Sequence, residues 1–196
     1  MTGVAGHITT WLIRHSSIKE NDRSLYEYAI YCLFLTVCPL LMVILNGFIM
    51  GLVKESILFI LPFMVIRKYS GGFHMKHAWT CFICSYTVLF LCIFVTARIR
   101  CSIFLNLLVL GATVSLIACS PIDCDNHQLD LTEKQIYKKT IIWISILFLS
   151  IYGTLLFFGL GDYAKWIGAG LILPAISQIP VIIIKLADRY RGRELN

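Results

Sequence analysis

The chain has 196 residues, of which 58% are hydrophobic and only 14% are charged. A soluble domain carries about 25% charged residues, and intrinsic disorder requires low hydrophobicity with high net charge, so both classes are excluded. The net charge of +6 fits loops beside an anionic leaflet, and no basic stripe interleaved with aromatic residues indicates nucleic-acid binding. The remaining class is an all-α polytopic membrane protein, with a single membrane domain over residues 1–196.

The first 27 residues mix apolar and basic positions at helical spacing. Ile8, Leu12 and His15 recur along one face, and Arg14 lies on another, a pattern typical of an amphipathic helix in the membrane interface. A plain N-terminal lead-in is the alternative. The first long apolar run begins near Ala29, too late and too long for a cleaved signal peptide, which predicts a retained span.

Hydropathy predicts six apolar segments. They are residues 29–52, 56–66, 78–97, 102–119, 140–160 and 164–187. The second segment is short and contains Pro62, so it is either a short tilted span or a re-entrant segment. Pro39, Pro174 and Pro180 are expected to kink the helices that contain them.

The basic residues decide between these alternatives for the second segment. With six crossings and a cytoplasmic N-terminus, thirteen of the 17 Lys and Arg residues fall on the cytoplasmic side, as the positive-inside rule requires. Without that crossing, three basic clusters would change sides. The sequence therefore predicts about six transmembrane helices with both termini in the cytoplasm, and it places residues 67–81 and the loop 120–139 on the cytoplasmic face.

A cluster of possible nucleophiles, bases and metal ligands follows a Gly-Gly pair at the start of the third apolar segment. Its members are His74, His77, Cys81 and Cys84. On one helix all four would share a stripe, but seven residues place His74 about 10 Å from Cys81. Contact between these two therefore requires His74 to lie in a loop that folds back, which a turn at Gly71 and Gly72 makes possible.

Three interpretations of this cluster compete. A Cys–His dyad would use the imidazole to deprotonate a thiol that attacks a carbonyl. The spacing H-x2-H-x3-C-x2-C also offers four zinc ligands. The third interpretation is a set of unrelated polar residues at the membrane interface. His77 and Cys84 have the same seven-residue separation as His74 and Cys81, so spacing does not choose the pair.

The segment RKYSGGFH, with Cys81 seven residues after the His, resembles the accessory gene regulator B family. This family comprises bacterial membrane endopeptidases that process quorum-sensing propeptides. Its pattern is a basic pair, a Gly-containing turn, a His and a Cys. These positions are matched here by Arg67, Lys68, Gly71, Gly72, His74 and Cys81. A second match is Ser120-Pro121-Ile122-Asp123, where the family usually has Ala-Pro.

The resemblance implies a cysteine endopeptidase of the bacterial cell membrane. Cys81 would attack a carbonyl near the C-terminal end of a small propeptide, with His74 as the general base. A cysteine or serine of the propeptide would then attack the thioester and release a cyclic thiolactone or lactone. The resemblance also implies a homodimer, and neither a cofactor nor a metal. The alternative is a non-enzymatic transporter or a zinc-binding membrane protein that uses the same two His and two Cys residues.

Supporting roles fall on residues around the pair. Arg67 and Lys68 are candidates for binding acidic residues of the propeptide, or are simply topogenic anchors. Ser85 either orients the dyad or bonds to its own helix. Asp123 orients His74 if the two cytoplasmic loops meet, and is otherwise a solvated carboxylate.

Overall fold

The computed structural model describes residues 2–15, 20–71, 78–122 and 130–193, and within these ranges the chain is helical without a strand. The elements in chain order are α1 (Thr2–Arg14), the short 3-10 helix η1 (Glu20–Asp22), α2 (Arg23–Met50), α3 (Val53–Ser70), α4 (Ala78–Arg98), α5 (Ile103–Cys119), α6 (Leu131–Phe157) and α7 (Gly161–Arg193). The predicted all-α class is confirmed.

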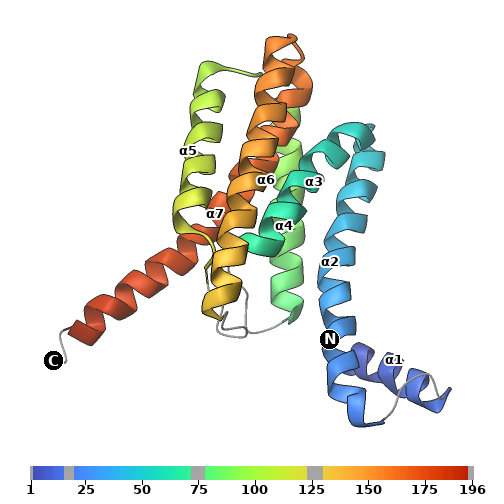
Figure 1. The fold of residues 1–196 in the computed structure, drawn as a ribbon. Coiled ribbons are helices and arrows are strands. Elements are labelled where there is room, and N and C mark those ends of the chain that lie inside the picture. Colours follow the sequence, from blue (N-terminus) through green and yellow to red (C-terminus); the bar gives the residue numbers. More distant parts are fainter. Residues whose placement is uncertain (1, 16–19, 72–77, 123–129, 194–196) are drawn as a thin grey trace.

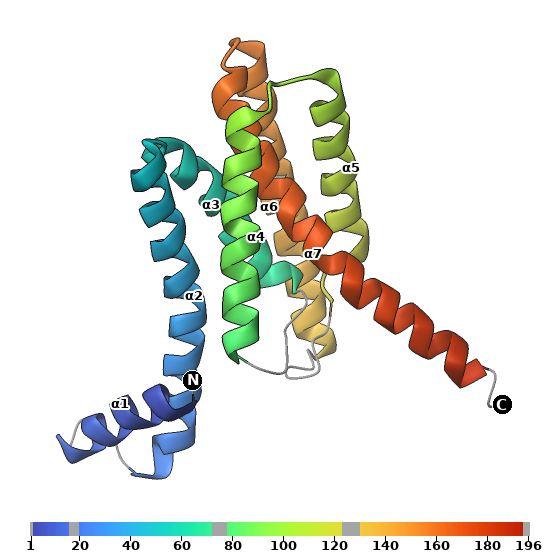
Figure 2. The ribbon, with the colours of Figure 1, turned by 180° about the vertical axis from the view of Figure 1, so that it is seen from behind.

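From α2 onward, consecutive helices alternate in direction along the bundle, as Figure 1 and the reverse view in Figure 2 show. The last residues of α3 and α5 and the first residues of α4 and α6 therefore lie at the same end. We call this end, marked by Ser70, Ala78, Cys119 and Leu131, the motif end. It brings together the two chain segments that the sequence singled out.

Two helical stretches are long and apolar enough to cross a membrane, Thr132–Phe157 of α6 and Gly161–Ile184 of α7. In the most apolar part of the α6 stretch only 22% of residues are buried. A core helix of a soluble protein is mostly buried, so the outward apolar surface of α6 fits contact with lipid. Shorter apolar stretches lie in α2 (Val37–Met50), α4 (Ile83–Arg98) and α5 (Ile103–Cys119), and the count of six spans stays a prediction.

The doubtful second segment is longer than its apolar run. It forms α3, an 18-residue helix over Val53–Ser70 with Pro62 inside it. Hydropathy detected only its middle, because charged residues occupy both ends of the helix, with Glu55 in the first turn and Arg67 and Lys68 in the last.

The prediction of a polar loop over residues 120–139 is wrong in its second half, because α6 already begins at Leu131. The Asp130 N–H donates to the Glu133 carboxylate at 3.2 Å, and the Thr132 hydroxyl donates to the Asp130 carboxylate at 3.0 Å. These bonds resemble a capping box, in which an acidic residue three positions after the cap accepts the cap's free N–H. The spacing D-x-x-E before an apolar run indicates this helix start, which hydropathy alone does not detect.

Helix α7 packs against α3, α4, α5 and α6. Two buried apolar clusters lie on either side of it. One joins α7 to α5 and α6 around Val109, Tyr152 and Leu171. The other joins α7 to α2, α3 and α4, and includes Phe59, Ile93 and Trp166.

Gly170 allows α7 to approach α3 at close range. A Cβ at this position would lie 2.5 Å from the carbonyl oxygen of Phe59 and 2.5 Å from Cγ of Pro62. Lipid tails are as apolar as leucine, so helix association in a bilayer depends on such close packing of small residues. Gly170 is thus a contact point on which the bundle depends.

We expect Gly170→Ala to lower the free energy of unfolding by about 1–3 kcal/mol, because the added methyl overpacks the contact with the α3 backbone. Thermal unfolding of the detergent-purified chain measures the effect. The matched control is Gly153→Ala on α6, where a Cβ would meet nothing within 4 Å and helix propensity improves. Equal Tm changes in the two variants would contradict the close-packing argument.

Candidate functional site at the motif end

Cys81 lies in the first turn of α4, at the motif end of the bundle. The other member of the predicted pair, His74, lies outside the described residues, as do Gly72, His77 and Asp123. Among the described neighbours of Cys81 on α4, Cys84 is exposed and Ser85 is half-buried. Around the predicted pair, the structure therefore describes the end of α3 before His74, the start of α4 with Cys81, and the residues after α5 that precede Asp123.

The two basic residues at the end of α3 lie in different environments. Arg67 is half-buried, and its Nη1 donates to the hydroxyl of Ser177 on α7 at 2.8 Å. Lys68 is exposed, and its ammonium lies 5.5 Å from the ring centre of Tyr69. Arg67 therefore connects α3 to α7, while Lys68 presents its charge at the surface of the motif end.

Gly71 ends α3 in a conformation that glycine alone adopts readily. Its φ of 72° and ψ of −168° fall in a region that side chains exclude. A Cβ at this position would also overlap the carbonyl oxygen of Ile122. The structure ends α3 at Gly71, and a close contact with the second motif segment explains why a glycine is needed there. The turn over Gly71 and Gly72 stays a prediction.

The two motif segments meet where they leave their helices. The backbone N–H of Ile122 donates to the carbonyl oxygen of Ser70 at 3.1 Å. Ile122 directly precedes Asp123 in the chain, and Ser70 lies four residues before His74. The two segments therefore meet at the residues where they leave their helices, and the orientation of His74 by Asp123 stays a prediction.

A third helix holds this contact from inside the bundle. Gln178 of α7 is fully buried, and its Nε2 donates to the Ser70 carbonyl oxygen at 3.3 Å and to the Ser120 hydroxyl at 2.7 Å. We call the set Ser70, Ser120, Ile122 and Gln178 the clamp. Sequence reasoning missed Gln178, although a single amide inside an apolar helix is a signal of an intramembrane polar role.

Lys138 of α6 binds the end of α5 beside the clamp. Its ammonium donates to the carbonyl oxygens of Ala118 at 3.1 Å and Ser120 at 2.8 Å, and also to that of Ile117. A cation at a helix C-terminus bonds the last free carbonyls and opposes the partial negative charge of the helix dipole. No local sequence pattern predicts which carbonyl oxygens Lys138 reaches.

Within the described ranges, no three His, Cys, Asp or Glu side chains form a group that could hold a metal ion. The zinc alternative rests on His74 and His77, both outside those ranges. Binding measurements must therefore decide it.

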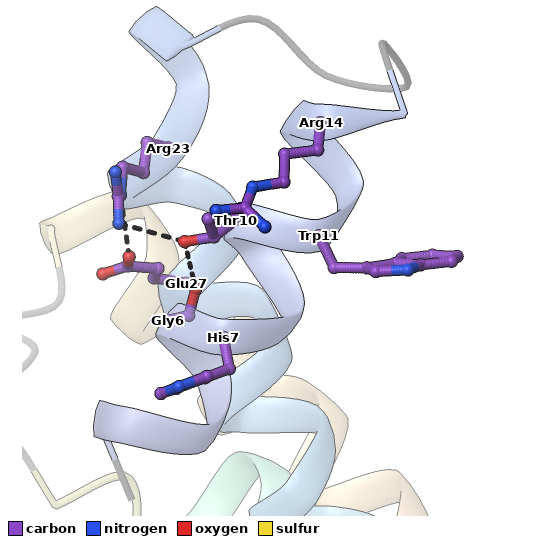
Figure 3. Close-up of a pocket in the computed structure, with 7 residues that line it drawn as sticks. All are labelled: Gly6, His7, Thr10, Trp11, Arg14, Arg23 and Glu27. Carbon is purple, nitrogen blue, oxygen red and sulfur yellow. Dashed lines mark hydrogen bonds and ion pairs between the residues drawn. The ribbon is translucent and has the colours of Figure 1, made fainter.

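A cavity of about 730 Å³ lies far from the motif residues in sequence, between α1 and the start of α2 (Figure 3). Arg23 pairs with Glu27 at 3.1 Å and donates to the Thr10 hydroxyl at 3.2 Å. Trp11 points away from these residues in Figure 3 and is 58% exposed. The predicted N-terminal helix is thus present and is attached to α2, with an apolar side chain left on its outer face.

The sequence pattern of the family described as accessory gene regulator B matches residues 5–182. The chain belongs to this family. The match includes the whole of the motif end, and the predicted resemblance is confirmed. Membership supports a role in the accessory gene regulator, a quorum-sensing system, with a propeptide substrate in a membrane context.

Two relatives come from Clostridium perfringens. They are an AgrB-like protein of strain SM101 and AgrB-like protein 2 of strain 13. Each is 21% identical over an alignment of 196 positions. The alignment covers 90% of this chain and 91% of the relative. No solved structure matches the chain. The relationship therefore covers nearly all of the chain at modest identity.

We expect Gly71→Ala to destabilise the chain by about 1–3 kcal/mol from backbone strain alone, and to displace Ile122 as well. Thermal unfolding in detergent measures the loss. Gly51→Ala is the matched control, because Gly51 also has a positive φ, of 69°, but a Cβ there would meet nothing within 4 Å. That control should lose only the ~1–2 kcal/mol of a left-handed residue, and an equal or larger loss there would contradict the contact with Ile122.

Proposed function

We propose that the chain is a membrane cysteine endopeptidase that cleaves a small quorum-sensing propeptide and promotes its cyclisation. Cys81 is the nucleophile and His74 the general base. The observation that carries the proposal is the family match over residues 5–182, which includes both residues at the expected spacing. The position of Cys81 in the first turn of α4, at the motif end, supports it.

The reaction proceeds in two acyl transfers. His74 takes the proton of the Cys81 thiol, and the thiolate attacks the scissile carbonyl near the C-terminal end of the propeptide. The imidazolium then protonates the leaving amine, so that the tail departs and a thioester remains on Cys81. A thiol or hydroxyl of the propeptide attacks this thioester, Cys81 leaves as a thiolate and regains a proton, and the product is a thiolactone or a lactone. Exclusion of water favours ring closure over hydrolysis.

Chain length supports contact between the two catalytic residues. Three peptide units separate His74 from Gly71, so their Cα atoms lie at most about 11 Å apart. Gly71 is held against Ile122, and Cys81 lies one turn into α4. His74 is thus tethered between two placed elements, and Asp123, one residue beyond Ile122, is the carboxylate that we propose orients its imidazole.

The remaining predicted residues take supporting roles in this proposal. Lys68, exposed at the motif end, attracts acidic residues of the propeptide. Arg67, bonded to Ser177, holds the end of α3 in place. Gly72 and Pro121 shape the two segments, and Ser85 supports Cys81 from the next turn of α4.

We also propose that α2 to α7 all cross the membrane, with the motif end and both termini in the cytoplasm and two chains forming a homodimer. The alternating helix directions (Figure 1) and the concentration of basic residues at the motif end support this topology. The dimer rests on the family resemblance.

Single-cysteine labelling tests the topology. In a variant without native cysteines, Lys54→Cys in the first turn of α3 should react with a membrane-impermeant maleimide in intact cells, whereas Lys139→Cys on α6 should react only after permeabilisation. Both positions are exposed, so access to the reagent depends on the side of the membrane. Reaction of Lys139→Cys in intact cells would contradict a cytoplasmic motif end.

Replacement of the catalytic pair tests the activity. Cys81→Ala and His74→Ala should each abolish cleavage of a co-expressed propeptide, because no thioester forms without the thiolate. Mass spectrometry measures cleavage of the propeptide and detects the acyl species linked to Cys81, so that both steps are followed. Cys84→Ala is the matched control, since Cys84 is an exposed cysteine on the same helix, and it should keep substantial activity.

The same variants separate the proposal from the zinc-binding or transport alternative. That alternative predicts stoichiometric zinc in the purified protein, lost on replacing His77 or Cys84, and no acyl species. Cleavage that persists in Cys81→Ala at the wild-type level would refute the endopeptidase mechanism.

A further inference from the structure

Gln178 is a polar side chain placed where an apolar one would ordinarily be found. It is fully buried, whereas its neighbours Ile176 and Ile179 on α7 are 53% and 50% exposed. A buried amide without hydrogen bonds is costly, so its presence requires partners or a function. Its two N–H groups have partners in the clamp, the Ser70 carbonyl oxygen and the Ser120 hydroxyl.

The orientation of the amide follows from these partners. The reverse orientation would set Oε1 against the Ser70 carbonyl oxygen, two acceptors with no proton between them. In the observed orientation, Oε1 is buried and has no hydrogen-bond partner among the residues that the structure describes. An apolar residue at this position would remove the unmet acceptor but would also take the amide donor away from the buried Ser120 hydroxyl, so the amide is kept for the contacts it makes with both segments.

The clamp also lies at the base of both segments that carry the proposed catalytic groups. Ser70 is followed by Gly71 and the chain to His74, while Ser120 and Ile122 lead directly to Asp123. These two segments come from α3 and α5, about fifty residues apart in the chain, and Gln178 contacts both through a single amide. A small displacement at this point therefore changes the position of one segment relative to the other.

We propose that Gln178 is a positioning residue, which sets the geometry of the His74–Cys81 pair by holding the two segments together from inside the bundle. This inference rests on the proposed function. Gln178 acts through Ser70 and Ser120 and does not itself touch the reacting atoms. Its loss should lower kcat more than it raises KM, since it affects the alignment of groups and not the binding of the propeptide.

The decisive variant is Gln178→Met, which keeps side-chain length and volume and removes both donors. With the full chain in liposomes and its propeptide, we expect kcat to fall roughly 10- to 100-fold, since misplacement by about 1 Å costs this much, while KM changes less than about threefold. Ser120→Ala, which removes one partner of the amide, should give a smaller loss in the same direction. Ile179→Ala, on the outer face of the same helix, is the matched control and should retain wild-type kcat.

A second readout tests the pair without turnover. In chains that keep Cys81 and lack the other cysteines, the rate of Cys81 alkylation by iodoacetamide is measured against pH. If Gln178 positions His74, then Gln178→Met and His74→Ala should shift this profile alike, because each uncouples the imidazole from the thiol. A purely structural role would lower Tm and leave the profile of the folded fraction unchanged.

Gln178→Met with wild-type kcat, or with an unshifted alkylation profile in folded protein, would overturn the inference. Failure of the proposed function looks different, because the wild-type chain would then not cleave the propeptide at all. In that case the alkylation profile still decides whether Gln178 controls Cys81 through His74. If Gln178→Met does not fold, Ser120→Ala decides by the same two measurements.

Discussion

The close approach of α7 to α3 is the contact on which the rest of the structure depends. Helices in lipid gain little from hiding apolar surface from one another, so they associate where small residues permit backbone contact. Gly170 provides such a place, against Phe59 and Pro62 of α3. Eight residues further along, about two turns of helix, α7 reaches the end of α3 with Gln178. The same helix pair thus supplies both packing in the middle of the bundle and polar contact at the motif end.

The arrangement separates stability from chemistry along α7. Its first half is surrounded by two apolar clusters that include Trp166 and Leu171. Near its start, Lys165 donates to the carbonyl oxygen of Ile99. At the motif end, Ser177 and Gln178 bond to Arg67 and to the clamp. A rigid apolar scaffold therefore ends in a small polar region, a design expected where loops must be held in fixed relation for catalysis.

The sequence predicted what depends on local pattern. The helical class, the presence of a helix at the second apolar segment and the helix end at Gly71 follow from hydropathy, charge and a Gly-Gly pair. The true ends of α3 and α6 were missed because charged residues such as Arg67 and Glu133 continue or begin a helix, which hydropathy does not measure. The clamp could not be predicted, because Ser120 is fifty residues from Ser70 and 58 from Gln178 along the chain, and only the folded structure brings them into contact.

The bonds of Lys138 have a consequence for the segment between α5 and α6. One side of that segment is held by the bond from Ile122 to Ser70, and its far side leads to a helix whose Lys138 returns to the Ser120 carbonyl oxygen. Both ends are therefore fixed to the same few atoms, independently of the residues between them. The junction between α5 and α6 is thus fixed through Ser120, Ile122 and Lys138, so a substitution at Lys138 on α6 would release the end of α5 as well.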